Sequence, residues 1–227
     1  MPGYIDIIYD EKVRPYTEYP GQLCNYLLHR FNIKKEDRLL EVGCGRGDFL
    51  KGFKDSGLNV CGLDYERPLS QVMLKDIEVR YANLENEPFP FDNDVFDVVF
   101  SKSVIEHIFK PENFMKESYR VLKPGGRIVL MTPDWISQMK IFFDDYTHRQ
   151  PYAVAGVKDA LNIFGFTEVS SELFYQLPML WRYPALKVLS RILQLLVPVT
   201  TKSRIKFIRW SVELMILGTG IKQFEKG

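Results

Sequence analysis

The sequence contains little cysteine and little histidine, three of each in 227 residues. Cys24, Cys44 and Cys61 show neither the CxxC spacing of a zinc site nor the density of a disulfide-stabilised fold, so their pattern predicts no metal site and fits a reducing cytoplasm. The first 13 residues carry acids and alternating polar residues in place of a basic start and an apolar run, so no secretory signal is predicted. The most apolar stretch, 179–199, is interrupted by three basic residues, whereas a membrane-spanning helix needs about 20 mostly apolar residues. We therefore expect a cytoplasmic protein without a membrane span.

Acidic residues are absent from 173–212, although seven Lys and Arg residues lie there. The whole chain has a net charge of +1, and outside this segment 23 basic residues stand against 29 acidic ones. The positive charge is therefore local. It predicts an anionic partner for this one segment and does not indicate a protein that binds nucleic acid through its whole surface.

Short apolar runs alternate with helical segments from 38 to 133, which is typical of a parallel sheet with crossover helices. The runs are continuous, as in strands that are covered on both faces. With 46% hydrophobic residues, the chain can build one α/β domain with an appendage. The pattern predicts strands at 38–42, 59–63, 77–82, 96–100, 127–131, 166–174 and 210–217, and helices at 48–56, 111–122 and 156–164.

The segment 41–47, Glu-Val-Gly-Cys-Gly-Arg-Gly, follows the first predicted strand and opens a helix. Glycine allows a tight turn and close approach of a ligand, and amides at a helix start can hold a carboxylate. Asp48 stands where the dinucleotide-binding pattern needs Gly or Ala, which disfavours a nicotinamide-dependent oxidoreductase. Glu41 lies where a positively charged amino or sulfonium group can be accommodated. Asp64 ends the second strand, the place from which a carboxylate binds ribose hydroxyls.

Five motifs in order resemble the signature of class I, Rossmann-like S-adenosylmethionine-dependent methyltransferases of the small-molecule type. The resemblance covers roughly 38–133 and extends more loosely to about 169. It implies an α/β fold with a seven-stranded, mostly parallel sheet, an antiparallel last strand, and helices on both faces. The motifs are LEVGCGRG at 40–47, GLD at 62–64, PFPFD at 88–92 with FDVV at 96–99, VIEHI at 104–108, and RVLKPGG at 120–126.

The resemblance implies S-adenosyl-L-methionine as the cofactor. The three glycines of the turn would flank its methionine part, Asp64 would bind its ribose, and Tyr65 would lie beside the adenine. Asn83 stands where the family usually has an acid for the adenine amino group, and its side-chain oxygen can still accept a hydrogen bond. The implied cofactor residues are Glu41, Gly43, Cys44, Gly45, Gly47, Asp64, Tyr65, Asn83, Leu84, Ser101 and Lys102.

Two histidines are the candidate catalytic residues. Methyl transfer from a sulfonium is an in-line displacement, so the protein mainly aligns the reacting atoms and no metal is required. A hydroxyl acceptor benefits from a general base, and neutral histidine suits this role at pH 7. We favour His148, in a polar aromatic loop after the fifth strand, over His107, which follows the fourth strand and has a structural role as its alternative. His29 is predicted to be structural or exposed.

The expected reaction is methylation of a small, sugar- or lipid-linked acceptor at oxygen, with nitrogen and carbon left open. A nucleic-acid substrate is not expected, because no Asn-Pro-Pro-Tyr-like motif is present. A non-catalytic S-adenosylmethionine-binding protein is the alternative, since a fold and a cofactor do not fix a function. The expected organisation is an N-terminal lid or helix at 1–30, a cofactor-binding core at 31–175, a basic helical insertion at 176–209, and the last strand of the sheet at 210–227.

Two further segments have open interpretations. Tyr16, Tyr19 and Pro20 precede the N-terminal helix, where they form either a lid over the sulfonium or ordinary packing. The segment 184–197 has a wide apolar helical stripe with Lys187, Arg191 and Gln194 on its narrow polar face. This helix either covers the sheet or the acceptor site, forms a dimer interface, or lies on an anionic membrane as part of a peripheral contact through 184–209.

Overall fold

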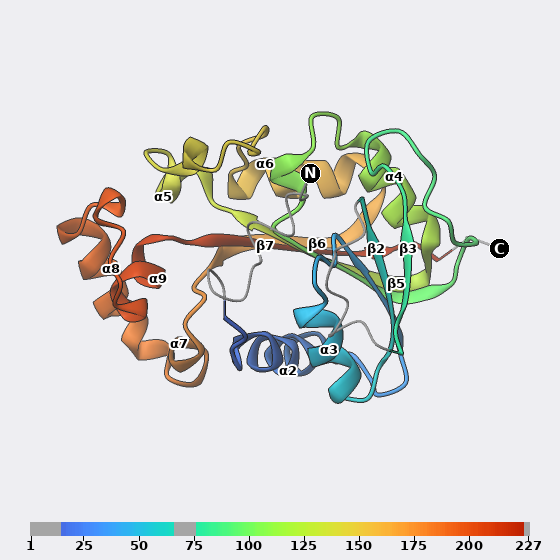
Figure 1. The fold of residues 1–227 in the computed structure, drawn as a ribbon, viewed down its shortest axis with the longest axis horizontal. Coiled ribbons are helices and arrows are strands. Elements are labelled where there is room, and N and C mark those ends of the chain that lie inside the picture. The colour runs from blue at the N-terminus through green and yellow to red at the C-terminus, as the bar shows by residue number, and fades with distance from the viewer. Residues whose placement is uncertain (1–14, 66–75, 225–227) are drawn as a thin grey trace.

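The computed structural model of this chain describes residues 15–65 and 76–224. The described residues form a seven-stranded sheet that runs through the middle of the molecule, with helices above and below it (Figure 1). The order of the strands is β3-β2-β1-β4-β5-β7-β6. The strands are β1 (Arg38–Val42), β2 (Asn59–Asp64), β3 (Glu78–Tyr81), β4 (Phe96–Lys102), β5 (Leu122–Pro133), β6 (Phe166–Phe174) and β7 (Met215–Lys222).

The direction of β7 is opposite to that of its two neighbours, β5 and β6. The pairs β1–β2, β1–β4, β2–β3 and β4–β5 are parallel. The expected mostly parallel sheet with an antiparallel last strand is therefore confirmed. Because parallel strands end at the same edge, the segments that follow β1, β2 and β4 are brought together.

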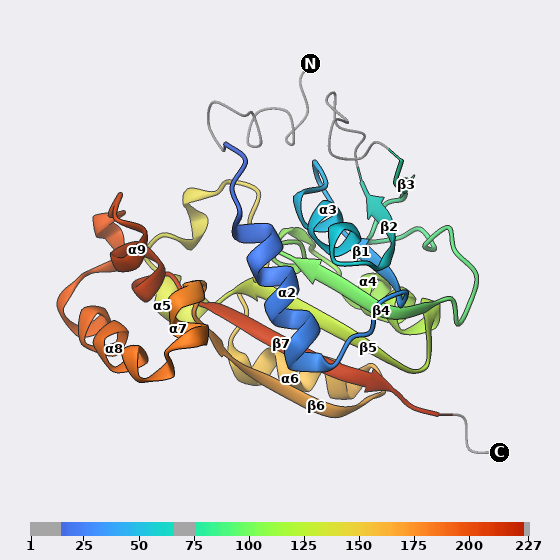
Figure 2. The same cartoon turned by 90° about the horizontal axis from the view of Figure 1, so that it is seen from below.

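Helices cover both faces of this sheet. Helices α2 (Tyr19–Phe31) and α3 (Asp48–Asp55) lie on one face, and α4 (Glu112–Val121) and α6 (Val154–Ile163) lie on the other (Figures 1 and 2). The shorter elements η2 (Ile105–His107), α5 (Trp135–Gln138) and η3 (Phe142–Asp144) follow β4 and β5. Between β6 and β7 lie α7 (Pro178–Arg182), η4 (Pro184–Leu186), α8 (Lys187–Leu196), η5 (Val199–Thr201) and α9 (Lys206–Val212).

The hydrophobic core has two layers, one on each side of the sheet. Successive residues of a strand point to opposite faces. Leu39 accordingly belongs to the cluster that contains Leu23 of α2 and Phe53 of α3, whereas Leu40 belongs to the cluster that contains Phe114 of α4. Covering of both faces explains why these strands appear in the sequence as continuous apolar runs.

The last strand begins later than the sequence analysis predicted. The expected strand at 210–217 is wrong at its start, because α9 continues to its last turn there and β7 begins only afterwards. Gly218 and Gly220 lie inside β7. A Cβ atom at Gly218 would lie 2.5 Å from Val157 Cγ1, and one at Gly220 would lie 2.7 Å from Phe166 Cβ. Glycine is needed here because α6 and β6 pack closely against the strand.

The orientation of α8 corrects a second expectation. Ser190 and Gln194 face the protein: Ser211 Oγ of α9 donates to Ser190 Oγ at 2.9 Å, and Gln194 Nε2 donates to the Ser211 carbonyl at 2.8 Å. The apolar side of α8 faces outward, with Leu195 86% exposed and Leu196 72% exposed. The apolar stripe therefore does not cover the sheet. Within the described residues, none of the helices has both the length and the apolar character needed to cross a bilayer.

Candidate functional site

The glycine turn, residues 43–47, connects β1 to α3. Gly43, Gly45 and Gly47 have φ values of +77°, +53° and +88°, in the left-handed region that favours glycine. The backbone N–H groups of Gly43 and Cys44 donate to the carbonyl of Leu63 at 2.7 and 3.2 Å. These hydrogen bonds attach the turn to the end of β2, so the two segments form one edge.

Two glycines of this turn serve different purposes. A Cβ atom at Gly43 would overlap the side chain of Val104, so this glycine is required by the protein's own packing. A Cβ atom at Gly45 would meet no described atom within 4 Å. Protein packing therefore does not require glycine at position 45. The space beside it is the kind of cradle that a ligand approaching the backbone would fill, as expected for the cofactor.

Asp64 lies at the end of β2 and is buried. Its Oδ2 accepts a hydrogen bond from the Gly45 N–H at 2.6 Å, and its Oδ1 accepts one from the Tyr65 N–H at 2.7 Å. These bonds fix the orientation of the carboxylate. A carboxylate oxygen can accept more than one hydrogen bond, which is the property that binding of ribose hydroxyls requires. The adjacent Tyr65 is 62% exposed at the same edge, as a residue beside an adenine would be.

Glu41 is a buried acid in β1, two residues before the glycine turn. Burial raises the pKa of its carboxyl well above the usual range, and the nearby carboxylates of Asp64 and Asp48 raise it further, whereas Lys102 acts in the opposite direction. Among the described residues, none forms a hydrogen bond with Oε2 of Glu41. A buried acceptor close to other acids fits a cationic group, such as the ammonium or sulfonium of S-adenosylmethionine.

The residues at the end of β4 contribute support to this edge. Ser101 is fully buried, and its hydroxyl donates to the Val42 carbonyl at 2.9 Å, which braces β4 against β1. Lys102 follows, with Nζ 5.6 Å from the ring centre of Phe49. The Ser101 hydroxyl is therefore occupied within the protein, and the backbone of Ser101 is the part that can serve a ligand.

The remaining predicted cofactor residues have mainly structural side chains. The Cys44 thiol is buried close to Gly62, so only the backbone of Cys44 can serve a ligand at this turn. Asn83 uses its side-chain oxygen to accept the N–H of Glu85 at 2.9 Å, and one lone pair of that oxygen remains for an adenine amino group. Leu84 is buried in the core.

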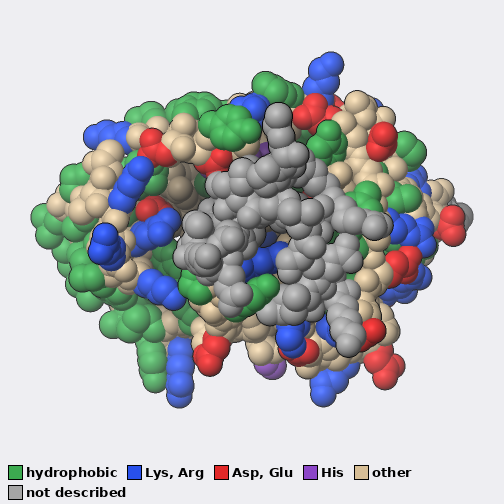
Figure 3. All heavy atoms as spheres, in the orientation of Figure 1, with side chains coloured by type: hydrophobic (Ala, Val, Ile, Leu, Met, Phe, Trp, Pro, Cys, Tyr) green, Lys and Arg blue, Asp and Glu red, His purple; other side chains and the backbone are tan. Residues whose placement is uncertain are grey.

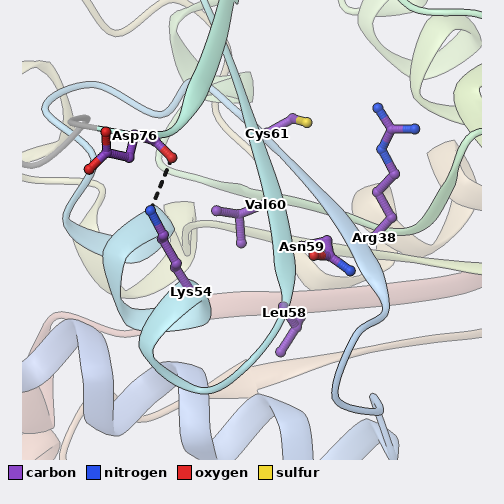
Figure 4. Close-up of a pocket in the computed structure, with 7 residues that line it drawn as sticks. All are labelled: Arg38, Lys54, Leu58, Asn59, Val60, Cys61 and Asp76. Carbon is purple, nitrogen blue, oxygen red and sulfur yellow. Dashed lines mark hydrogen bonds between the residues drawn. The ribbon is translucent and has the colours of Figure 1, made fainter.

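The pocket drawn in Figure 4 lies elsewhere. It has a volume of about 210 Å³ and surrounds the first residues of β1 and β2, at the edge opposite to the glycine turn. Lys54 Nζ donates to the Asp76 carbonyl at 3.0 Å across it. Cofactors of parallel sheets bind at the carboxyl ends of the strands, so this pocket is not part of the candidate site.

His107 and His148, here called the histidine pair, come together although they lie far apart in the sequence. Their ring centres are 4.8 Å apart and their planes make an angle of 63°. His107 ends η2 directly after β4, and His148 lies in the loop that follows η3. The backbone N–H of His107 donates to the carbonyl of Val104, whose side chain lies against Gly43. Val104 thus connects the glycine turn to the histidine pair.

Hydrogen bonds assign the same tautomer to both histidines. His148 Nδ1 lies 2.6 Å from the carbonyl oxygen of Phe142, which can only accept, so Nδ1 carries the proton. The Thr147 hydroxyl donates to Asp145 Oδ1 at 2.6 Å, so it accepts from His107 Nδ1 at 2.9 Å. In both rings the lone pair is therefore on Nε2. Burial, together with the neighbouring His148, lowers the pKa of His107 to about 4, so this imidazole is neutral at pH 7.

Glu106 is the residue that the sequence analysis missed. It stands beside His107 in the motif VIEHI, is fully buried, and accepts the Thr132 hydroxyl at 2.9 Å through Oε2. Burial raises the pKa of its carboxyl to about 7. Its backbone carbonyl accepts the N–H groups of Arg149 and Gln150 at 2.7 and 3.0 Å, which hold the loop of His148 in place. Ligand atoms of Glu106 and the histidine pair lie within 4.8 Å of one another, a grouping that sequence spacing could not reveal.

The N-terminal aromatic residues separate into two roles. The Arg46 guanidinium lies 4.3 Å from the ring centre of Tyr16, beside the glycine turn, and pairs with Asp48 at 2.8 Å. Tyr19 is instead part of α2 and packs against Trp210, with ring centres 4.9 Å apart. The lid interpretation is thus wrong for Tyr19. The rest of the expected lid, residues 1–14, lies outside the described residues.

Comparison with known proteins identifies the family. A family model described as a methyltransferase domain matches residues 10–171 of the chain. The chain belongs to this methyltransferase family. With the seven-stranded sheet, this confirms the class I S-adenosylmethionine-dependent fold expected from the motifs.

Similar proteins include methyltransferases with different acceptors. The chain is 28% identical over 158 residues to phosphoethanolamine N-methyltransferase 2 of Caenorhabditis elegans, and the match covers 64% of this chain and 36% of that enzyme. It is 30% identical over 129 residues to a ubiquinone biosynthesis O-methyltransferase of Pseudomonas fluorescens, and this match covers 54% of this chain and 55% of that enzyme. It therefore spans about a third to a half of the length of these relatives.

A solved structure supports the fold. Phosphoethanolamine N-methyltransferase 2 of Haemonchus contortus in complex with S-adenosyl-L-methionine has a TM-score of 0.68 and 17% identity, and the match covers 99% of this chain and 61% of that one. At this identity the likeness concerns the fold alone.

Proposed function

We propose that this methyltransferase transfers the methyl group of S-adenosylmethionine to an oxygen atom of a small, sugar- or lipid-linked acceptor. The observation that carries the proposal is the joining of two groups of residues at one edge of the sheet. The glycine turn with Glu41 and Asp64 lies on one side of Val104, and the histidine pair follows on the other. The first group suits a cationic nucleoside ligand and the second suits a hydroxyl.

Different cofactor residues would bind different parts of S-adenosylmethionine. When bound, S-adenosylmethionine supplies a methyl group that is already activated by its sulfonium. The carboxylate of Asp64 would receive the ribose hydroxyls, and the backbone around Gly45 would receive the methionine part. Glu41 offers its buried Oε2 to the positive charge. Tyr65 and Asn83 would lie beside the adenine.

The histidine pair acts on the acceptor hydroxyl. Its Nε2 atoms carry lone pairs, so His148 or His107 can take the hydroxyl proton as the oxygen attacks the methyl carbon. The carbon–sulfur bond breaks, its electron pair remains on sulfur, and the oxygen–carbon bond forms. His148 is the preferred base, because the lowered pKa of His107 makes that imidazole a weak base.

An acceptor panel tests this proposal. The purified protein is incubated with S-adenosylmethionine and with alcohols, phenols, sugars, polyprenyl-linked sugars and amines, and S-adenosylhomocysteine release is measured with mass spectrometry of the products. The expected result is a product heavier by one methylene group on oxygen. Methylated amines as the products would move the reaction to nitrogen, as in the name of the nematode relative. Tight cofactor binding without turnover on any acceptor would favour a non-catalytic binding protein.

We further propose that α8 rests on an anionic membrane surface, which would suit a lipid-linked acceptor. Apolar side chains of α8 face outward, among them Val188, Leu195 and Leu196, and exposed basic residues such as Arg191 accompany them. Figure 3 displays hydrophobic and basic side chains together at the end of the molecule formed by α7 to α9. An exposed apolar helix face with basic flanks is typical of helices that lie in the headgroup region.

Vesicle cosedimentation tests the membrane contact. At low salt, the protein is expected to sediment with vesicles that contain phosphatidylglycerol and to remain in solution with neutral vesicles. Leu195→Asp should abolish sedimentation, whereas Ile163→Asp, at an apolar position that is 77% exposed on α6, should not. If the wild-type protein does not bind vesicles but forms a dimer, and Leu195→Asp dissociates that dimer, α8 belongs to a protein interface instead.

A further inference from the structure

We propose that Glu106, His107 and His148 form a binding site for a divalent first-row transition-metal ion of the Zn²⁺ type, which holds the acceptor oxygen. This inference deepens the proposed function and rests on it. The three side chains offer two imidazole nitrogens and one carboxylate oxygen, all within 4.8 Å of one another. Two histidines and one carboxylate are a ligand set used by zinc and iron sites that keep open positions for a substrate.

The orientation of the imidazoles supports a shared ion. Metal-binding histidines usually donate their other ring N–H to a carbonyl, a carboxylate or a similar acceptor, which fixes the nitrogen that binds the metal. Both histidines have this arrangement: Nδ1 of His148 donates to the Phe142 carbonyl, and Nδ1 of His107 donates to Thr147. Thr147 in turn donates to Asp145. Nε2 is therefore the ligand atom on each ring.

The carboxylate of Glu106 supplies the second, independent observation. It is fully buried, and Thr132 satisfies only its Oε2. No described residue forms a hydrogen bond with Oε1. A buried carboxylate oxygen without a partner is costly, and the cost is removed when the oxygen binds a cation. Oε1 is also the atom that remains for the ion, since Oε2 is oriented by a hydroxyl.

Backbone hydrogen bonds hold the segments that carry these ligands together before any ion binds. The carbonyl of Glu106 accepts the N–H groups of Arg149 and Gln150, so the loop that carries His148 is attached to the 3-10 helix that carries His107. A site whose ligands are already oriented loses little conformational entropy on binding.

The donor set indicates the kind of metal. Imidazole ligands suit Zn²⁺ and other first-row ions, whereas Mg²⁺ prefers oxygen ligands and keeps its waters. Both histidines are only half-buried, which leaves a coordination position accessible to a hydroxyl. A cation held there would lower the pKa of a bound acceptor hydroxyl, so that the hydroxyl would give up its proton to water more readily. With both Nε2 atoms on the ion, this effect replaces proton transfer to a histidine. The oxygen then attacks the methyl carbon, and the electron pair of the broken carbon–sulfur bond stays on sulfur.

Metal binding can be measured without any turnover. The untagged protein, treated with a chelator and dialysed, is titrated with Zn²⁺ by calorimetry, and with Co²⁺ while the visible absorption is recorded. We expect one ion per chain, a Co²⁺ spectrum with histidine coordination, and no comparable binding of Mg²⁺. His148→Ala and Glu106→Gln should weaken Zn²⁺ binding by about 100-fold or more, since each removes a direct ligand. His29→Ala is the matched control, because it removes the exposed third histidine, and should leave binding unchanged.

Cofactor affinity serves as the folding control for these variants. A His148→Ala protein that binds S-adenosylmethionine like the wild type is folded, so its loss of Zn²⁺ binding supports the site even if Glu106→Gln fails to fold. Absence of Zn²⁺ binding in the wild type, or equal binding in the folded His148→Ala protein, would overturn the inference. Full methyl transfer in metal-free protein would refute the metal and retain the proposed function. A stoichiometric Zn²⁺ site in a protein that does not bind S-adenosylmethionine would retain the metal site and refute the function.

Discussion

The backbone N–H of Gly45 donates a 2.6 Å hydrogen bond to Oδ2 of Asp64. This bond joins the turn after β1 to the end of β2. The same carboxylate also accepts the N–H of Tyr65, so its orientation is fixed from two sides. One acid thus shapes the turn that approaches the methionine part of the cofactor and presents acceptors to the ribose.

Asp64→Ala should weaken S-adenosylmethionine binding by about 1.5–3 kcal/mol, because hydrogen bonds to a charged group are lost. This corresponds to a rise in Kd of roughly 10- to 150-fold, measurable by calorimetry. Asp55→Ala, which removes an exposed acid at the end of α3, is the control and should have no effect. An Asp64→Ala protein with near wild-type affinity would mean that the ribose lies elsewhere.

The two glycines Gly43 and Gly45 should respond differently to alanine. Gly43→Ala places a methyl group against Val104 and should destabilise the fold by about 2–4 kcal/mol, from strain at positive φ together with overpacking. Val104→Ala should recover part of this loss, because it clears the space. Gly45→Ala should cost only about 1–2 kcal/mol of stability, for the positive φ alone, while reducing cofactor affinity. Urea denaturation and calorimetry measure the two quantities. Equal losses of stability in both variants would contradict the distinction.

Much of this site was predictable because its residues lie at strand ends. A buried parallel strand is a continuous apolar run, so the positions of Glu41 and Asp64 followed from the ends of such runs. The glycine turn was visible for the same reason. Strand β7 was harder, because the sequence alone does not show that Gly218 and Gly220 lie inside a strand against which Val157 and Phe166 pack closely.

The histidine pair and Glu106 show what the sequence could not reveal. The positions of His107 and His148 after β4 and β5 made each a candidate, but their contact requires the loop at 145–150 to fold back onto η2. Glu106 gave no separate signal, because a buried acid and an exposed acid look alike in a sequence. For α8, the pattern predicted an apolar stripe correctly but could not indicate that Ser190 faces the protein and Leu195 does not.

Glu41→Gln should make the cofactor-free protein more stable at high pH. The pKa of Glu41 is raised in the folded state above its unfolded value of about 4.3, so folding favours the protonated form. The stability that this group provides is fully present below the unfolded pKa and is lost as the pH rises toward the folded pKa. The Tm of Glu41→Gln relative to wild type should therefore increase from pH 4 to pH 8, while its cofactor affinity falls because Gln cannot ionise in response to a bound cation.

The comparison uses thermal unfolding in the absence of cofactor, with the exposed Glu36→Gln as the matched control. That variant should follow the wild type at every pH. A Glu41→Gln protein whose Tm difference does not change with pH would show that folding does not shift the pKa of Glu41, which contradicts the prediction.

Thr147 should act as a positioning residue for the histidine pair. Its hydroxyl connects His107 Nδ1 to Asp145, so Thr147→Val removes the acceptor that fixes the tautomer of His107. Loss of such an outer partner typically costs 10- to 100-fold in activity, and we expect kcat to fall by about 10-fold with unchanged cofactor Kd. Thr147→Ser should restore the rate because it restores the hydroxyl. Thr167→Val, which removes a hydroxyl on β6 that bonds to the Ile221 carbonyl, should leave kcat unaltered. If Thr147→Ser is as slow as Thr147→Val, the methyl group of Thr147 matters and the hydroxyl does not, which contradicts a positioning role through His107.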